Sequence, residues 1–195
     1  MRIMIMDTSS EYLIVSFLED NKLIYEYIAP GKNNHSDNLL KMIEEGLKQN
    51  NLEVKDFDKI ICGGGPGAYT GLRVALTVAK MFAWTLNLPL YIVSSLDLMA
   101  TKYLAEDGKV IAIDMKAKKD YVYHKIIKCN GNGYDEIEGE VFLEKVEADK
   151  NNNKYSVDIF ISNDHIGYDA TGVEKVARRV ENIDLLEPNY LREGM

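Results

Sequence analysis

The sequence predicts an α/β fold, and three observations support this. Short β-branched and apolar runs open the chain, two helical segments follow, and a glycine-rich stretch at residues 62–73 joins a buried strand to the second helix. Strands alternating with helices are typical of a sheet covered by helices. We expect a domain boundary near residue 105, giving an N-terminal lobe of residues 1–105 and a C-terminal lobe of residues 106–195.

Three strands are predicted at the start of the first lobe, at Ile3–Met6, Tyr12–Leu18 and Leu23–Ile28. Residues 19–22, Glu-Asp-Asn-Lys, are typical of a turn. The second and third strands are therefore expected to form an antiparallel hairpin beside the buried first strand.

An amphipathic helix is predicted over Ser36–Lys48, after a polar loop at Pro30–Asn34 and with Ser36 as N-cap. Its apolar residues recur at helical spacing at Leu39, Leu40, Ile43 and Leu47. The rest of the lobe is predicted as strand Lys59–Cys62, the glycine loop, helix Leu72–Leu86 and strand Leu90–Val93.

The second lobe has weaker signals. Strands are predicted at Val110–Asp114, Tyr121–Ile127 and Val157–Ser162, loops at Asn130–Gly133 and Lys150–Lys154, and a helix over about residues 172–180. No repeat of the three-strand opening is evident. The lobe is therefore either a reduced copy of the first lobe or an extension of its sheet, and the sequence leaves both open.

Composition limits the function. A formal charge of -8 and a pI near 5.0 disfavour autonomous binding to RNA or DNA, because that binding depends on Lys and Arg displacing counterions from phosphates. Any nucleic acid would require a basic partner. The two cysteines have no zinc-ligand spacing, and no apolar run is long enough for a signal peptide or a membrane helix. We expect a cytoplasmic protein that does not enter a membrane.

The glycine loop contains five glycines and Pro66. A strand-to-helix loop of this kind presents amide groups at the positive end of a helix, so Gly65, Gly67 and Thr70 are candidates for anion or nucleotide binding. It is not a Walker A loop, because Thr70-Gly71-Leu72-Arg73 lacks the required lysine and the hydroxyl residue after it. The alternative is a tight turn that only packs the helix on the sheet.

The helix after this loop is unusually apolar. Its polar residues Arg73, Thr77 and Lys80, together with Trp84, fall within an arc of about 60°. The remaining apolar arc is about twice the ~100° stripe of a helix on one core, so the helix needs cover on two sides. A second polypeptide could supply one of these, and Trp84 is either a surface anchor or packed under a loop. The alternative is a wholly internal helix under a long connection.

Candidate catalytic groups are few. None of the three histidines is paired at helical spacing, and no Gly-x-Ser-x-Gly elbow occurs, so we expect no catalytic residue and no metal site. Asp7 is followed by Thr8-Ser9-Ser10. Its carboxylate could hold Mg²⁺ or a nucleotide-bound water, or these four residues could form a hydroxyl-rich turn that caps its own backbone. Asp114 is either a cleft carboxylate or a turn residue. His35 is more typical of a structural or interfacial residue.

Five segments carry a resemblance, and they occur in a fixed order. They are Met6-Asp7-Thr8-Ser9, His35-Ser36 followed by Leu39, the loop from Gly65 to Arg73, Ser94-Ser95-Leu96, and Pro188-Asn189-Tyr190-Leu191-Arg192. In these segments, and along nearly its whole length, the chain resembles the bacterial TsaB (YeaZ) family. The glycine loop with its Thr-Gly-Leu-Arg end is the most specific of them.

The resemblance implies an actin-like ATPase (RNase H-like) fold with a complete N-terminal lobe and a reduced C-terminal lobe. It implies a non-catalytic subunit that acts with TsaD and the ATPase TsaE. Together these proteins form threonylcarbamoyladenosine beside the anticodon of tRNA. TsaD is a paralogue that binds metal and transfers the threonylcarbamoyl group. The resemblance further implies a homodimer when the chain is alone, tRNA contact only through the complex, and no cofactor other than ATP or ADP at a subunit interface.

In the family, paired N-terminal helices form a helical bundle with TsaD or with a second TsaB. Carried to this chain, the partner-binding residues are His35, Leu39, Leu40, Ile43, Leu72, Arg73, Ala75, Leu76, Ala79, Lys80 and Ala83. One turn departs from the family pattern, since Asp114-Met115-Lys116 and Lys119 stand where many members have Asp-Ala-Arg and then Glu or Gln. A nucleotide or partner role for that turn is therefore doubtful.

Two other functions are considered. An actin-like-fold small-molecule kinase or ATPase would use Asp7, the glycine loop and Asp114 around Mg²⁺ and nucleotide. Ser9 weakens this hypothesis, because such folds usually have glycine there. A peptidase would need a histidine pair or a nucleophile motif, and the sequence has neither.

Overall fold

A computed structural model describes residues 1–30 and 35–191, with side chains from residue 38 onward in the first helix. The chain forms two compact units, each with its own sheet. The first unit holds Met1–Ser95 and Ala177–Asn189, and the second holds Leu96–Val176 and the residues from Tyr190. The chain thus enters the second unit after residue 95, earlier than the boundary expected near residue 105, and it returns to the first unit at residue 177.

The first unit contains a six-stranded sheet in the order β10-β5-β4-β1-β2-β3. Its strands are β1 (Arg2–Asp7), β2 (Tyr12–Glu19), β3 (Lys22–Pro30), β4 (Lys59–Gly63), β5 (Leu90–Val93) and β10 (Arg178–Arg179). β1, β2 and β3 are antiparallel, while β4 pairs in parallel with β1 and β5 with β4. The predicted hairpin is confirmed, and its turn places Asp20 and Asn21 at positive φ.

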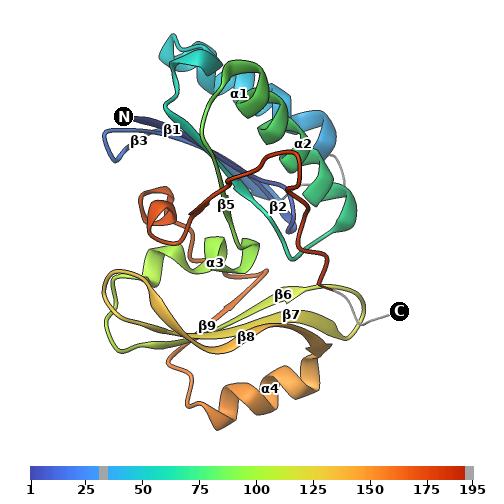
Figure 1. Cartoon of the computed structure of the whole chain (residues 1–195). Helices are drawn as coiled ribbons and strands as arrows, with labels where there is room; N and C mark the ends of the chain where they lie inside the picture. The colour runs from blue at the N-terminus through green and yellow to red at the C-terminus, as the bar shows by residue number, and fades with distance from the viewer. Residues whose placement is uncertain (31–34, 192–195) are drawn as a thin grey trace. The chain divides into compact units, whose positions relative to one another are not determined.

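Helices α1 (His35–Asn50) and α2 (Tyr69–Leu86) pack together against this sheet (Figure 1). Both predicted helices are confirmed. α1 begins at His35, so Ser36 lies inside the helix and not at its N-cap. The predicted polar loop lies, after Pro30, outside the described residues. A short 3-10 turn, Val54–Asp56, leads from α1 towards β4.

The second unit contains a separate four-stranded sheet in the order β8-β7-β6-β9. Its strands are β6 (Val110–Lys116), β7 (Tyr121–Cys129), β8 (Tyr134–Glu144) and β9 (Ile159–Ser162). β6, β7 and β8 are antiparallel and β9 is parallel to β6, which repeats the arrangement of β1, β2, β3 and β4. The alternative in which the second lobe extends the first sheet is therefore wrong.

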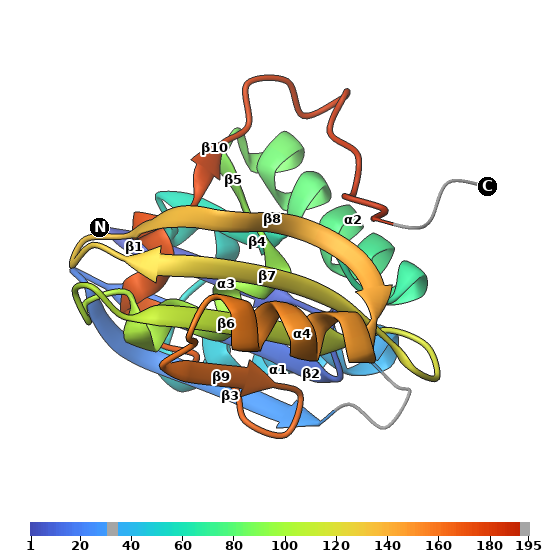
Figure 2. The same cartoon turned by 90° about the horizontal axis from the view of Figure 1, so that it is seen from below.

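Two segments in the C-terminal half of the chain differ from the prediction. Residues 150–154, predicted as a loop, belong to α4 (Lys145–Lys154), which contacts β7 and β8 and is drawn in front of the sheet in Figure 2. The helix predicted over residues 172–180 is a 3-10 helix, Ala170–Lys175, followed by β10. The remaining elements are α3 (Ser95–Ala100) and a 3-10 turn, Thr101–Tyr103.

Candidate functional site

Asp7 ends β1 beneath the glycine loop and is almost completely buried. Its carboxylate accepts hydrogen bonds from the hydroxyls of Ser9 (2.9 Å) and Ser95 (3.3 Å). Burial raises the pKa of Asp7 to about 6, although these hydrogen bonds oppose the rise. The local structure is the hydroxyl-rich turn that the sequence offered as one reading of this motif.

The glycine loop is packed against this same turn. A Cβ atom on Gly71 would lie 1.9 Å from the carbonyl oxygen of Thr8, and one on Gly67 would lie 2.4 Å from that of Ser9. Thr8 also donates its hydroxyl to the carbonyl of Gly71. The glycines are therefore needed because two segments of the chain's own backbone approach closely.

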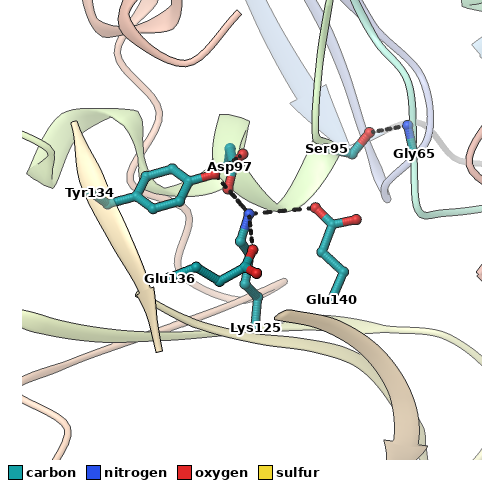
Figure 3. Close-up of polar contacts among 7 residues, drawn as sticks. All are labelled: Gly65, Ser95, Asp97, Lys125, Tyr134, Glu136 and Glu140. Carbon is teal, nitrogen blue, oxygen red and sulfur yellow. Dashed lines mark hydrogen bonds and ion pairs between the residues drawn. The ribbon is translucent and has the colours of Figure 1, made fainter. Parts of the chain in front are cut away.

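Three amide groups of the loop have acceptors within the chain. Gly64 donates to the carbonyl of Val93 (2.8 Å), and Ala68 donates to that of Ser9 (2.7 Å). Gly65 donates to the hydroxyl of Ser95 at 3.1 Å (Figure 3). A phosphate bound to these three amides would have to displace these bonds.

The predicted anion-binding residues are only partly brought together. Asp7, Gly65 and Gly67 gather around the turn, while Thr70 is exposed in the first turn of α2. Asp114 belongs to the second unit, where its carboxylate is 2.6 Å from Nδ1 of His124.

The predicted partner-binding residues fall into two groups. Most are buried in the first unit's own core: Leu39, Ile43, Leu72, Ala75, Leu76, Ala79 and Ala83. Leu40 and Arg73 are exposed and Lys80 is half-buried. The side chain of His35 lies outside the described part of the chain. The alanines that were expected to meet a partner are thus covered by the protomer itself.

Residues Ala177–Asn189 provide the second cover for α2. Val180, Ile183 and Leu186 of this segment pack against the same core cluster as the buried face of α2. Lys80 donates from Nζ to the carbonyl of Leu186 at 3.1 Å, and Figures 1 and 2 both place the segment beside α2. The cover expected from a second polypeptide is therefore supplied largely by the chain's own later residues, as in the long-connection alternative.

An apolar group nevertheless remains on the outer face of α2. Trp84 is 74% exposed and Met81 is 47% exposed. They lie on the same face as Thr77 and Arg73, since residues three or four apart are neighbours on a helix. On α1, Leu40 is 49% exposed. We call Arg73, Thr77, Met81 and Trp84 the outer face of α2.

A buried charged cluster in the second unit was not predicted (Figure 3). Lys125 is 3% exposed and donates to Asp97 (2.7 Å) and to the hydroxyl of Tyr134 (2.8 Å). Tyr134 donates in turn to Asp97. Burial alone would lower the pKa of Lys125, but the charge of Asp97 and its hydrogen bond raise that pKa above its usual value. Burial raises the pKa of Tyr134 to about 12.

Lys125 also lies within 3.7 Å of the carboxylates of Glu136 and Glu140. The cluster is saturated by its own partners, so it is best explained as a link between α3, β7 and β8. One signal in the sequence could have found it, because Lys125 interrupts the apolar run of β7 between Tyr123 and Ile126.

Among the residues that the structure describes, no three or more His, Cys, Asp or Glu side chains are placed to hold a metal ion. Within the same residues, no helix is long and apolar enough to cross a membrane.

Comparison with known proteins gives consistent results. The family described as TsaD, tRNA N6-adenosine threonylcarbamoyltransferase, matches residues 26–169. The tRNA threonylcarbamoyladenosine biosynthesis protein TsaB of Bacillus subtilis is 34% identical over 77% of this chain and 62% of its own length. The protein of the same name from Escherichia coli is 28% identical over 62% of this chain and 53% of its own length. The alignments thus span less than two thirds of these relatives.

The fold also matches solved structures. YeaZ from Pseudomonas aeruginosa superimposes with a TM-score of 0.78 at 20% identity, covering 97% of this chain and 99% of that one. A second structure, described as an uncharacterized protein with similarity to peptidase YEAZ, gives the same TM-score at 22% identity. At these identities the structures show a shared fold only.

Proposed function

Because the chain belongs to the TsaB (YeaZ) family, we propose that it is the non-catalytic partner subunit in threonylcarbamoyl transfer to the adenosine beside the anticodon of tRNA. It binds and activates the transferase subunit TsaD, together with the ATPase TsaE. TsaD supplies the metal and the reacting groups, and this chain supplies a surface that orients TsaD.

The exposed outer face of α2 is the observation that carries this proposal. Trp84 leaves about three quarters of its surface in water, so covering it with another protein would gain free energy, and tryptophan is enriched among residues that dominate binding energy. Arg73 stacks over the ring of Tyr69, 4.1 Å from its centre, which adds an ordered cation beside this face. On α1, Leu40 is a further exposed apolar residue of the first unit.

The packing of the glycine loop supports a non-catalytic role. In an actin-like kinase this region would hold phosphate, but here the Thr8–Ser9 turn occupies the space and Ser95 accepts from the loop amide. We therefore place any ATP or ADP at a subunit interface of the complex. In the same proposal the first unit is the complete actin-like lobe, the second is the reduced one, and the protein is cytoplasmic and homodimeric in the absence of TsaD.

Co-expression of the chain with its TsaD, followed by size-exclusion chromatography, tests the proposal. Trp84→Arg should prevent co-elution, because loss of a central tryptophan contact costs about 2 kcal/mol or more, or roughly a 30-fold weaker complex. Ala79→Arg is a poor test, since Ala79 is buried and the variant would fail to fold.

Val146→Arg is the matched control, because Val146 is an exposed apolar residue, 63% exposed, on α4 of the second unit. It should co-elute like the unmodified chain. If Trp84→Arg also co-elutes normally, the outer face of α2 is not the docking surface. Steady ATP hydrolysis by the isolated chain that is lost in Asp7→Asn would favour the kinase or ATPase alternative instead.

A further inference from the structure

The hairpin between β6 and β7 carries the densest group of lysines in the chain. Lys116, Lys118 and Lys119 occupy three of four consecutive positions, and all three are exposed. This is the turn that departs from the family pattern. In a chain with a net charge of -8, such a group forms a local basic patch that the proposed docking surface on α2 does not use.

The hairpin tip is held in a defined conformation. Ala117 donates to the carbonyl of Tyr121 (3.0 Å), and Tyr121 donates back to that of Lys118 (2.9 Å). The amide of Lys116 donates to the side chain of Asn163. Because the backbone is fixed, a ligand would pay less entropy to order these lysines than it would on a mobile loop.

A fourth lysine joins the tip from the start of α4. Lys145 donates its backbone N–H to the carbonyl of Asp120 at 2.8 Å, which fixes it next to the hairpin. Among residues 116–121, 144 and 145, the carboxylates belong to Asp120 and Glu144, and Glu144 accepts a hydrogen bond from the hydroxyl of Tyr121. Four lysines against two carboxylates leave the tip positively charged.

Two aromatic rings lie beneath one of these lysines, Lys118. Tyr121 and Phe142 are stacked, with ring centres 5.0 Å apart and planes 7° apart. The Nζ atom of Lys118 lies 5.7 Å from the centre of Tyr121 and 5.8 Å from that of Phe142. Both rings are only partly buried, so a flat ligand can replace the lysine side chain over them.

We propose that the β6–β7 hairpin tip is an RNA-binding surface for unpaired nucleotides. Lys116, Lys118, Lys119 and Lys145 contact phosphates, and the Tyr121–Phe142 pair stacks against a base. Basic side chains combined with aromatic rings are what single-stranded nucleic acids require, because the phosphates need cations and every base has a π face. An acidic protein partner would need only the lysines, so the presence of the aromatic pair favours a nucleic acid as the ligand.

This inference rests on the proposed function, since it assigns part of the tRNA contact to this subunit. It also refines the expectation that tRNA is reached only through the complex. With a charge of -8 the isolated chain should bind RNA weakly and only at low salt, and the complex with TsaD should bind more tightly. The hairpin would then add affinity that TsaD does not provide.

The test uses the 195-residue chain and a fluorescent stem-loop RNA with an unpaired loop, and measures anisotropy at several KCl concentrations. In Lys118→Gln/Lys119→Gln, affinity should fall on the order of tenfold, and the slope of log K against log salt should fall by about 2. The control Arg178→Gln/Arg179→Gln removes the same charge from exposed residues of β10 and should leave the slope unchanged. A fully paired duplex of the same length should bind more weakly than the stem-loop.

Equal losses in the two variants would overturn the proposal, because they would show only a general charge effect. No binding by the unmodified chain at low salt would also overturn it. Co-elution of Lys118→Gln/Lys119→Gln with TsaD separates this inference from the proposed function, since complex formation should be unaffected. Tyr121→Leu supplies an independent readout: it should weaken binding of the stem-loop while leaving the salt slope unchanged.

Discussion

Asp7→Asn should stabilise the protein at neutral pH, because the buried carboxylate of Asp7 destabilises the fold when it is ionised. Its pKa is raised to about 6 in the folded chain, from an ordinary value of 3.8. A group whose pKa is higher in the folded than in the unfolded chain contributes its full stabilisation at pH values below the unfolded-state pKa. This stabilisation is lost as the pH rises through the folded-state pKa. A difference of about two pKa units corresponds to about 3 kcal/mol, which is an upper limit for the gain.

Urea unfolding of both proteins between about pH 4 and pH 8 measures this effect. The stability of Asp7→Asn relative to the unmodified chain should rise between pH 4 and pH 6 and then level off. Asp158→Asn is the control with opposite sign, because hydrogen bonds from Val110 and Lys109 lower the pKa of Asp158. A difference for Asp7→Asn that is independent of pH, or that falls as the pH rises, would refute the reasoning.

Three further variants test the packing. Gly71→Ala places a Cβ atom 1.9 Å from the Thr8 carbonyl and should cost about 1–3 kcal/mol or more in urea unfolding, whereas Gly133→Ala, whose nearest neighbour is 3.8 Å away, should change stability by less than about 0.5 kcal/mol. Lys125→Met leaves the Asp97 carboxylate buried without its cation and should cost about 3–5 kcal/mol, much of which Lys125→Met/Asp97→Asn should restore. Trp84→Ala should leave the unfolding midpoint unchanged, since Trp84 is mostly exposed, and a large loss would mean that it packs inside the protomer.

The strands of the first unit other than β10, and its two long helices, could be predicted because their signals are local. Ile3–Met6 and Leu90–Val93 are short apolar runs, and Leu39, Ile43 and their neighbours have helical spacing. The glycine loop was recognised for the same reason. Its role was less certain, because glycine permits close approach both to a phosphate and to the chain's own Thr8–Ser9 turn.

The second unit was harder to predict because its patterns are interrupted. β8 contains five acidic residues and two register shifts against β7, which break the alternation of apolar and polar residues. The Asn151–Asn153 run has low helix propensity, yet it continues α4, which is anchored by the buried Ala148 and by the hydrogen bond from Asn151 to Glu138. Tertiary contacts outweigh local preference in both elements.

The partner face was assigned incorrectly in part because burial depends on residues far apart in the sequence. Ala75, Ala79 and Ala83 gave an apolar arc that indicated a partner. Contacts from Ile183 and Leu186, about a hundred residues later, cover one side of that arc, and no helical pattern reveals them. The sequence left Trp84 as either a surface anchor or a residue packed under a loop, and its exposure of 74% is consistent with the first interpretation.

The most direct test of the account is a threonylcarbamoyl-transfer assay that measures incorporation into tRNA by TsaD and TsaE, with and without this chain. We expect incorporation only when the chain is present, with loss of activity in Trp84→Arg and full activity in Asp7→Asn and Val146→Arg. Incorporation at the same rate without the chain, or loss of activity in Asp7→Asn with Trp84→Arg unaffected, would contradict the claim that this subunit acts through the outer face of α2.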